Sequence, residues 1–172
     1  MHPKASPEDR STFCKKVSEY KASQRPLVFL DESGFAHDMP RTHGYASRGE
    51  RCTGQHDWGA KGRTNVIGAL LGSVLLTVSL FQTTVNTAVF NGWVAQDLLP
   101  QLPPQSVVIM DNATFHKSEE MQKMLEAAGH TVLYLPPYSP DLNPIEHKWA
   151  QAKAYRRRFK CSINDLFQCH PL

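Results

Sequence analysis

The segment that decides the fold reads VIGALLGSVLLTVSLF, residues 66–81. Its apolar and β-branched residues indicate two strands, Asn65–Leu71 and Val74–Phe81. Gly72 and Ser73 separate them, and a two-residue connection that begins with glycine is typical of a β-hairpin. The run is shorter than the roughly 20 apolar residues that cross a bilayer, and small and polar residues interrupt it. We therefore predict buried strands and no membrane contact.

A third strand precedes this hairpin. In RPLVFLDES, residues 25–33, four apolar residues run without a break into an acid, so we expect a strand that ends at Asp31. Together with the hairpin it makes an antiparallel group of three. Between them, residues 37–63 are rich in Gly, His and Arg, which favours a long loop of the kind used for binding.

Helices and strands alternate after the hairpin. Residues 87–104 carry apolar side chains at helical spacing and end in prolines, which predicts an amphipathic helix. The segment SVVIMDNATFHKS, residues 106–118, predicts a buried strand that ends at Asp111. A helix bracketed by Ser118 and Gly129 follows.

A short strand, residues 131–136, and a last helix that begins near Asn143 complete the order β-β-β-α-β-α-β-α. A run of strands followed by alternating αβ units predicts an α/β fold with a mixed sheet and helices packed on it. The 172 residues suit one ordinary core. We expect an N-terminal extension (1–25), one domain (26–160) and a short tail (161–172).

The remaining sequence signals concern location and cysteines. The N-terminus has no apolar stretch of the signal-peptide kind, so a cytoplasmic protein is expected. The four cysteines form no CxxC pair, which favours reduced thiols. A zinc site is disfavoured because paired zinc ligands normally lie two to four residues apart on both sides; its ligands would be Cys52, His56, Cys169 and His170.

The net charge of +3 is unevenly distributed. Two segments are basic, and the remainder of the chain is net negative. Basic surfaces on an acidic body suggest a polyanion held at defined places, although the second cluster can equally be a solvated helix face. The clusters comprise Arg41, Arg48, Arg51, Lys61 and Arg63 in the first segment, and Lys148, Lys153, Arg156, Arg157, Arg158 and Lys160 in the second.

Three acids occupy special places: Asp31 and Asp111 at strand ends, and Glu146 in the first turn of the last helix. If the first and fourth strands lie side by side, both aspartates reach one sheet edge, and the helix can bring Glu146 to them. Crowded carboxylates repel and cost several kcal/mol to bury without a counter-charge. A hard divalent cation such as Mg²⁺ removes that cost. Two such cations bound side by side support phosphodiester chemistry.

Each acid also has an ordinary structural explanation. The two aspartates can simply turn the chain at a strand end, with Asp111 forming an Asx turn. Glu146 fits a capping box, with Asn143 at the N-cap position and Pro144 at the first helical position. Glu32 follows Asp31 on a strand and should point to the opposite face, so it is left out of the site.

Three motifs together carry a family resemblance: LDESGF (30–35), MDNATFHK (110–117) and YLPPYSPDLNPIEHKWAQAK (134–153). With 34 residues between Asp111 and Glu146, the chain resembles the DDE transposases of bacterial insertion sequences related to the mariner superfamily. The resemblance implies a ribonuclease H-like fold, a mixed five-stranded sheet with helices on both faces. It also implies that Asp31, Asp111 and Glu146 are the catalytic ligands of two Mg²⁺ ions, which Mn²⁺ can replace.

The resemblance carries further expectations. The family reaction cuts DNA at transposon ends to free a 3′-hydroxyl, which then attacks target DNA, so double-stranded DNA is the expected partner and a homodimer the expected active form. The basic residues above, apart from Lys160, are expected to contact DNA. Residues near the metals or the DNA backbone are expected to be Asn112, His116, Lys117, Asp141 and Asn143.

Related transposases carry helix-turn-helix domains that recognise the transposon ends, whereas about 25 residues precede the first strand here. End binding by this chain alone is therefore not expected. Two alternatives stay open: a catalytically silent DNA-binding remnant, and a ribonuclease H-like nuclease with another substrate, such as an RNA–DNA hybrid.

Overall fold

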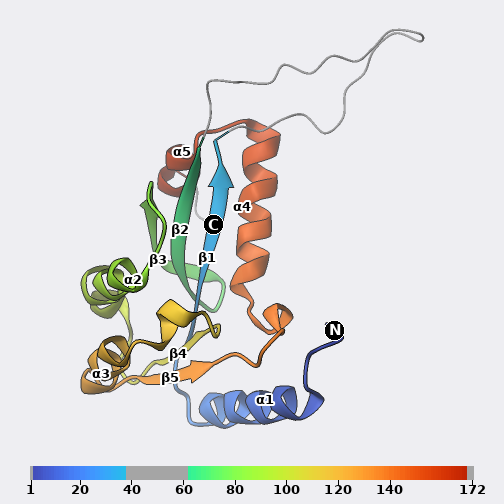
Figure 1. The fold of residues 1–172 in the computed structure, drawn as a ribbon, viewed down its shortest axis with the longest axis vertical. Coiled ribbons are helices and arrows are strands. Elements are labelled where there is room, and N and C mark those ends of the chain that lie inside the picture. The colour runs from blue at the N-terminus through green and yellow to red at the C-terminus, as the bar shows by residue number, and fades with distance from the viewer. Residues whose placement is uncertain (1, 38–61, 170–172) are drawn as a thin grey trace, which may run out of the picture.

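A single mixed sheet forms the centre of the computed structural model, which describes residues 2–37 and 62–169. Its strand order is β3-β2-β1-β4-β5 (Figure 1). This arrangement confirms the predicted five-stranded mixed sheet, with the first and fourth strands as neighbours. The strands are β1 (Leu27–Ala36), β2 (Arg63–Leu71), β3 (Val74–Phe81), β4 (Val107–Met110) and β5 (Thr131–Tyr134).

Helices cover both faces of the sheet, as expected. Side chains of α2 and α3 pack with Val28 and Leu30 on one face, whereas α1, α4 and α5 pack on the other. None of the helices in the described part of the chain is long and apolar enough to span a membrane. The helices are α1 (Pro7–Ala22), α2 (Thr87–Trp93), α3 (Glu119–Ala127), α4 (Ile145–Phe159) and α5 (Ile163–Cys169), and the short turns are η1 (Val94–Leu98), η2 (Leu99–Gln101), η3 (Thr114–Lys117) and η4 (Pro140–Leu142).

The central strand β1 is paired differently on its two sides. Antiparallel pairing with β2 runs from Val28 to Ala36, whereas parallel pairing with β4 ends at Phe29 opposite Ile109. The prediction that the strand ends at Asp31 is therefore wrong: Asp31 lies inside β1, opposite Gly68 of β2. What ends near Asp31 is the neighbouring strand β4, and this leaves one side of β1 open.

Several local predictions are confirmed. The hairpin of β2 and β3 turns at Gly72, whose φ of 61° suits glycine. Ser118 caps α3 by accepting a hydrogen bond from the Met121 amide, and Gly129 follows with φ 86°. The last helix begins at Ile145, slightly later than predicted.

Two helices add to the predicted order. Ser6 caps α1, and Phe13 of this helix packs against the sheet beside Val107. In the segment expected to be a tail, α5 buries Ile163 and Leu166 against α4 and β2. Both helices therefore contribute to the core.

Gly68 allows close packing between β2 and α4. A Cβ at Gly68 would lie 2.6 Å from Cη2 of Trp149. We predict that Gly68→Ala lowers the free energy of unfolding by about 1–3 kcal/mol, because the indole must move. Gly92→Ala in α2 is the control, since a Cβ there meets nothing within 4 Å; it should be neutral or stabilising by up to about 1 kcal/mol. Urea unfolding measures both, and equal effects would contradict this packing constraint.

Candidate functional site

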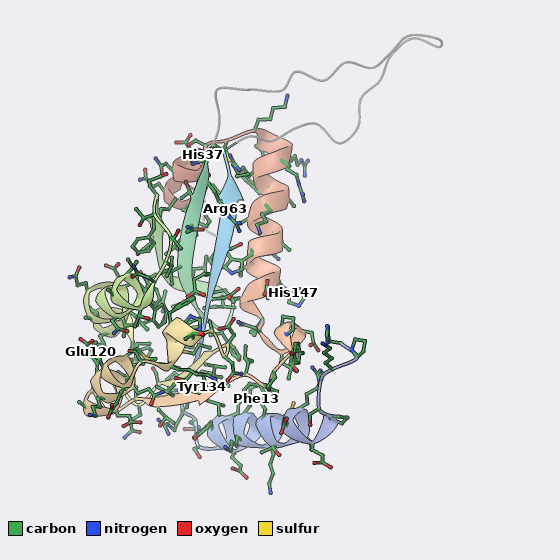
Figure 2. The ribbon with its side chains drawn as sticks, in the orientation of Figure 1. Phe13, His37, Arg63, Glu120, Tyr134 and His147 are labelled. Carbon is green, nitrogen blue, oxygen red and sulfur yellow. The ribbon has the colours of Figure 1, made fainter. Side chains whose placement is uncertain are left out.

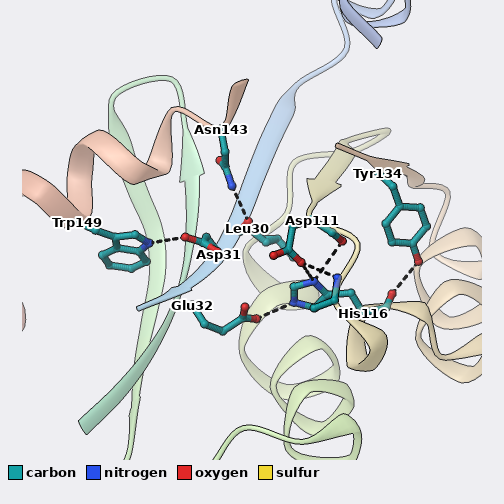
Figure 3. Close-up of polar contacts among 9 residues, drawn as sticks. Leu30, Asp31, Glu32, Asp111, His116, Tyr134, Asn143 and Trp149 are labelled. Atoms are coloured by element: carbon teal, nitrogen blue, oxygen red, sulfur yellow. Dashed lines mark hydrogen bonds and ion pairs between the residues drawn. The ribbon is translucent and has the colours of Figure 1, made fainter. Parts of the chain in front are cut away.

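Asp31 is a buried carboxylate on β1, with 9% of its surface exposed. Its Oδ2 accepts a hydrogen bond of 3.0 Å from the indole Nε1 of Trp149 (Figure 3). Trp149 lies on α4 and is itself buried. The hydrogen bond therefore joins Asp31 to the helix that carries Glu146.

Asp111 follows the last residue of β4. The parallel pairing of β1 with β4 ends with Phe29 opposite Ile109, and continuing this register by two residues would bring Asp31 level with Asp111. Asp111 Oδ1 accepts a 2.9 Å hydrogen bond from the Ala113 amide, and the side chain is 50% exposed. The sheet thus sets one buried and one half-exposed carboxylate on neighbouring chain segments.

A buried histidine joins Asp111 to Glu32. His116 Nδ1 lies 2.6 Å from Asp111 Oδ1, and its Nε2 lies 2.7 Å from Glu32 Oε1 (Figure 3). Burial lowers the pKa of His116, but the bonds to the two carboxylates outweigh it and raise the pKa to about 9. The imidazole is therefore charged at neutral pH. Its hydrogen bond in turn lowers the pKa of Asp111.

A side chain at the end of β5 holds the backbone of η3 in place. The Tyr134 hydroxyl donates a 2.6 Å hydrogen bond to the His116 carbonyl and accepts one from Gln122 of α3. Asn112 donates to the Leu135 carbonyl. These bonds hold the turn that follows Asp111, and they fix the position of the imidazole.

Glu146 is exposed in the first turn of α4. At the start of α4 the Ile145 amide donates a 3.4 Å hydrogen bond to Asn143 Oδ1, whereas the Glu146 carboxylate makes no hydrogen bond among the described residues, so it does not complete a capping box. Instead, its charge helps to raise the pKa of Asp31. Buried Asn143 donates a 3.2 Å hydrogen bond to the Leu30 carbonyl, and so fastens the start of α4 beside Asp31.

The electrostatics at Asp31 suit a cation. Burial, then the charges of Glu146 and Glu32, raise the pKa of Asp31 to about 7. Carboxylate oxygens are the donors that hard divalent cations prefer, and a cation would relieve this excess of negative charge. In residues 2–37 and 62–169, however, no three acidic, His or Cys side chains already converge on one metal position. The carboxylate donors therefore fit a divalent cation, although the side chains of the described residues are not arranged around a single metal position.

Two of the other predicted residues have ordinary partners. Lys117 is exposed, with its ammonium group 6.0 Å from the centre of the Tyr134 ring. Asp141 lies in η4 and forms a bidentate ion pair with Arg10 of α1, at 3.0 and 2.7 Å. This ion pair joins α1 to the loop before α4.

The basic residues predicted to contact DNA differ in exposure. Arg157 and Arg158 are exposed, as is Arg63, whose guanidinium packs over Gly34. Lys153 and Lys148 are half-buried. Arg156 departs from the expectation of a surface cluster: it is buried and donates to two backbone carbonyls. Outside the described residues lie Arg41, Arg48, Arg51 and Lys61, and the disfavoured zinc ligands Cys52 and His56.

Sequence reasoning missed Glu32 and Trp149. Strand alternation does send Glu32 to the opposite face from Asp31, but His116 reaches around the end of β4 to bind it. The adjacent acids in LDESGF were the available signal for Glu32. Trp149 lies three residues after Glu146, one helical turn along the same face.

The raised pKa of Asp31 predicts a pH-dependent stability in metal-free protein. An unfolded aspartate has a pKa near 3.9, so the native state binds more protons than the unfolded state between about pH 4 and 7. This group therefore lowers stability as the pH rises through that window. In EDTA at pH 8, Asp31→Asn should be more stable than wild type by on the order of 2 kcal/mol, with the gain shrinking toward pH 4.

Urea unfolding across this pH range tests the prediction. Asp9→Asn, which removes an exposed carboxylate on α1, is the control and should show no such gain. A gain at Asp31 that does not change with pH would mean that the carboxylate is not strained by burial.

Comparisons with known proteins identify the family and the fold. The family model described as DDE superfamily endonuclease matches residues 26–166. A search of curated proteins finds no match. The fold resembles the chain in the Mos1 strand transfer complex, with a TM-score of 0.68 and 23% identity over 86% of this chain and 47% of that chain.

Two further structures show the same fold. The Mos1 transposase paired-end complex with left transposon end matches with a TM-score of 0.70 and 21% identity, over 91% of this chain and 50% of that chain. The catalytic domain of Mos1 mariner transposase matches with a TM-score of 0.60 and 17% identity, over 92% and 74%. The chain spans about half the length of the transposase chains in the two complexes. It has the ribonuclease H-like fold of transposase catalytic domains, and it belongs to the DDE superfamily endonuclease family.

Proposed function

We propose that this chain is the catalytic domain of a transposase, of the bacterial insertion-sequence branch of the mariner superfamily. Its activity is metal-dependent cleavage of DNA at transposon ends, followed by strand transfer into target DNA. One observation carries the proposal: the pairing of β1 with β4 ends two residues before Asp31 and Asp111, so both carboxylates follow it on neighbouring chain segments, and the charge of Glu146 acts on Asp31. Family membership gives independent support.

Asp31, Asp111 and Glu146 are the proposed ligands of two Mg²⁺ or Mn²⁺ ions. Bound in pairs, such cations activate the attacking oxygen and stabilise the leaving oxygen of a phosphodiester. Asp111 Oδ2 suits this role, since it makes no hydrogen bond within the described residues. Structures of similar fold include Mos1 mariner paired-end complexes with Mn and with Mg, which supports the choice of cation.

The chain's own residues hold the carboxylates ready for this chemistry. His116 keeps Asp111 ionised and fixes its Oδ1, while Trp149 orients Asp31 from α4. In the cleavage step, a water oxygen bonds to phosphorus as the phosphorus–O3′ bond breaks, and the released 3′ oxygen takes a proton. In strand transfer, that 3′-hydroxyl bonds to a target phosphorus and displaces another 3′ oxygen. Both steps depend on positioning and charge neutralisation.

The proposed partners are duplex DNA at the transposon ends and at the target. Exposed Arg157 and Arg158 on α4 are suited to phosphate contacts. A homodimer is proposed because two ends must be paired, and paired-end and strand-transfer complexes among similar folds support this. The reaction is proposed to take place on nucleoid DNA in a bacterial cytoplasm.

Cleavage of labelled duplex carrying the element's ends tests the proposal directly. Wild type, supplied with an end-binding domain in cis, should nick the DNA in Mg²⁺ or Mn²⁺ and not in EDTA. Asp31→Asn, Asp111→Asn and Glu146→Gln should each lower the rate by at least about a hundredfold, because a ligand is lost. Glu146→Gln should not lower the unfolding free energy, since the carboxylate does not cap α4 and its charge raises the pKa of Asp31.

Matched variants give the controls. Asp165→Asn, which removes an exposed carboxylate on α5, should cut like wild type. Mg²⁺ should raise the melting temperature of wild type more than that of Asp111→Asn, by mass action on the native state. Cleavage that persists in EDTA or in Asp111→Asn would contradict the metal site. Metal-stimulated DNA binding without any cleavage would favour the silent remnant, and cutting of an RNA–DNA hybrid alone would favour the other nuclease.

A further inference from the structure

A pocket of about 450 Å³ lies at the end of the sheet remote from the acids. The end of β1, the start of β2 and the junction between α4 and α5 enclose it. Figure 2 shows His37 and Tyr134 near opposite ends of the sheet. The lining includes His37, Thr64, Arg156, Lys160, Cys161 and Asn164.

The charge of this pocket is positive. Arg156 and Lys160 both line it, and the described lining contains no aspartate or glutamate. Ser162, also in the lining, donates its hydroxyl to Asp165, which lies outside it. The pocket therefore presents two cations and several neutral polar groups to any ligand that enters.

Arg156 is a buried cation without a counter-charge. Its guanidinium donates to the carbonyls of Ala36 at 2.6 Å and His37 at 3.2 Å, and no carboxylate pairs with it among the described residues. Its Nε has no hydrogen-bond partner there either. Buried charges in proteins are normally paired with an opposite charge, so an anion in the adjoining pocket would complete this arrangement.

The rim of the pocket is accessible to a large ligand. Lys160 and Asn164 are exposed, and Lys160 adopts a left-handed conformation with φ 50° at the turn from α4 into α5. Arg157 and Arg158, which lie between Arg156 and Lys160 in the sequence, are exposed too. An anion carried on an extended polymer can therefore reach the pocket and contact the neighbouring cations.

We propose that this pocket binds a backbone phosphate of duplex DNA. The choice of DNA rests on the function proposed above. Ten residues of helix separate Glu146 from Arg156, which is about 15 Å, and six residues of strand separate Asp31 from His37, about 20 Å. That distance corresponds to roughly four to six base pairs, so one duplex can occupy both the acids and the pocket.

Cys161 can serve as a probe of the pocket, because this free, half-exposed thiol is part of the pocket lining. Cys14 on α1 is also free and exposed, and it lies outside the pocket. Alkylation of each cysteine is followed by mass spectrometry, in EDTA, with duplex DNA or with inorganic phosphate at equal ionic strength. At a DNA concentration about ten times the Kd, alkylation of Cys161 should slow about tenfold, because about a tenth of the pockets stay free. Cys14 should be unaffected.

Two pocket variants and one control complete the test. Lys160→Gln and Asn164→Asp should weaken DNA binding, and Lys160→Gln should reduce the slope of log K against log salt by about one. Lys16→Gln removes an exposed charge from α1 and should change neither the slope nor the protection of Cys161.

The outcomes are distinguishable. If wild type binds and cuts DNA while Cys161 stays unprotected and Lys160→Gln binds normally, the pocket proposal fails and the proposed function stands. Equal protection by inorganic phosphate alone would overturn the assignment to DNA in favour of a free anion. A wild-type protein that binds no DNA under any condition would overturn both proposals together.

Discussion

β1 has a full-length antiparallel partner on one side and a short parallel partner on the other. The pairing of β1 with β4 stops at Phe29, two positions before Asp31, and the chain turns away after Met110. Asp31 therefore lies in a strand whose backbone is fixed by β2, next to an opening left by β4. Asp111 enters that opening from β4 itself, and α4 crosses it with Trp149 and Glu146. The candidate site exists because one strand is shorter than its neighbour.

Several carboxylates lie around this opening, and only one of its two sides has a positively charged partner for them. On the side of Asp111, the buried imidazolium of His116 lies between two carboxylates and supplies one positive charge. On the side of Asp31, the side-chain partner is the neutral indole N–H of Trp149. The negative charge of this carboxylate is therefore not balanced by a positive charge. Asp111 is thus held ionised, whereas Asp31 has a pKa close to neutrality. This asymmetry is what a cation shared between them would remove.

Much of the fold could be predicted from the sequence because its signals are local. The hairpin of residues 65–81 combines two apolar strands with a turn at Gly72, and Ser118 marks the start of α3. The end of the first strand was misjudged because an acid after an apolar run indicates a chain turn, whereas Asp31 is buried against Trp149 from a helix more than 100 residues away. Glu32 was left out of the site because strand alternation points it away from Asp31, and no local pattern shows that its partner His116 lies 84 residues along the chain. Arg156 belongs to a run of three arginines, and no local pattern distinguishes the one whose side chain turns inward.

Asp31, Asp111 and Glu146 are proposed to converge on bound divalent cations. Replacing Mg²⁺ with Fe²⁺ and generating hydroxyl radicals at the bound iron would cut the polypeptide close to the ion, and mass spectrometry would locate the cuts. The account predicts cleavage near residues 31, 111 and 146 in the same molecules, suppressed by excess Mg²⁺ and absent from Asp111→Asn. Cleavage at other positions, or cuts near these residues that Mg²⁺ does not suppress, would contradict it.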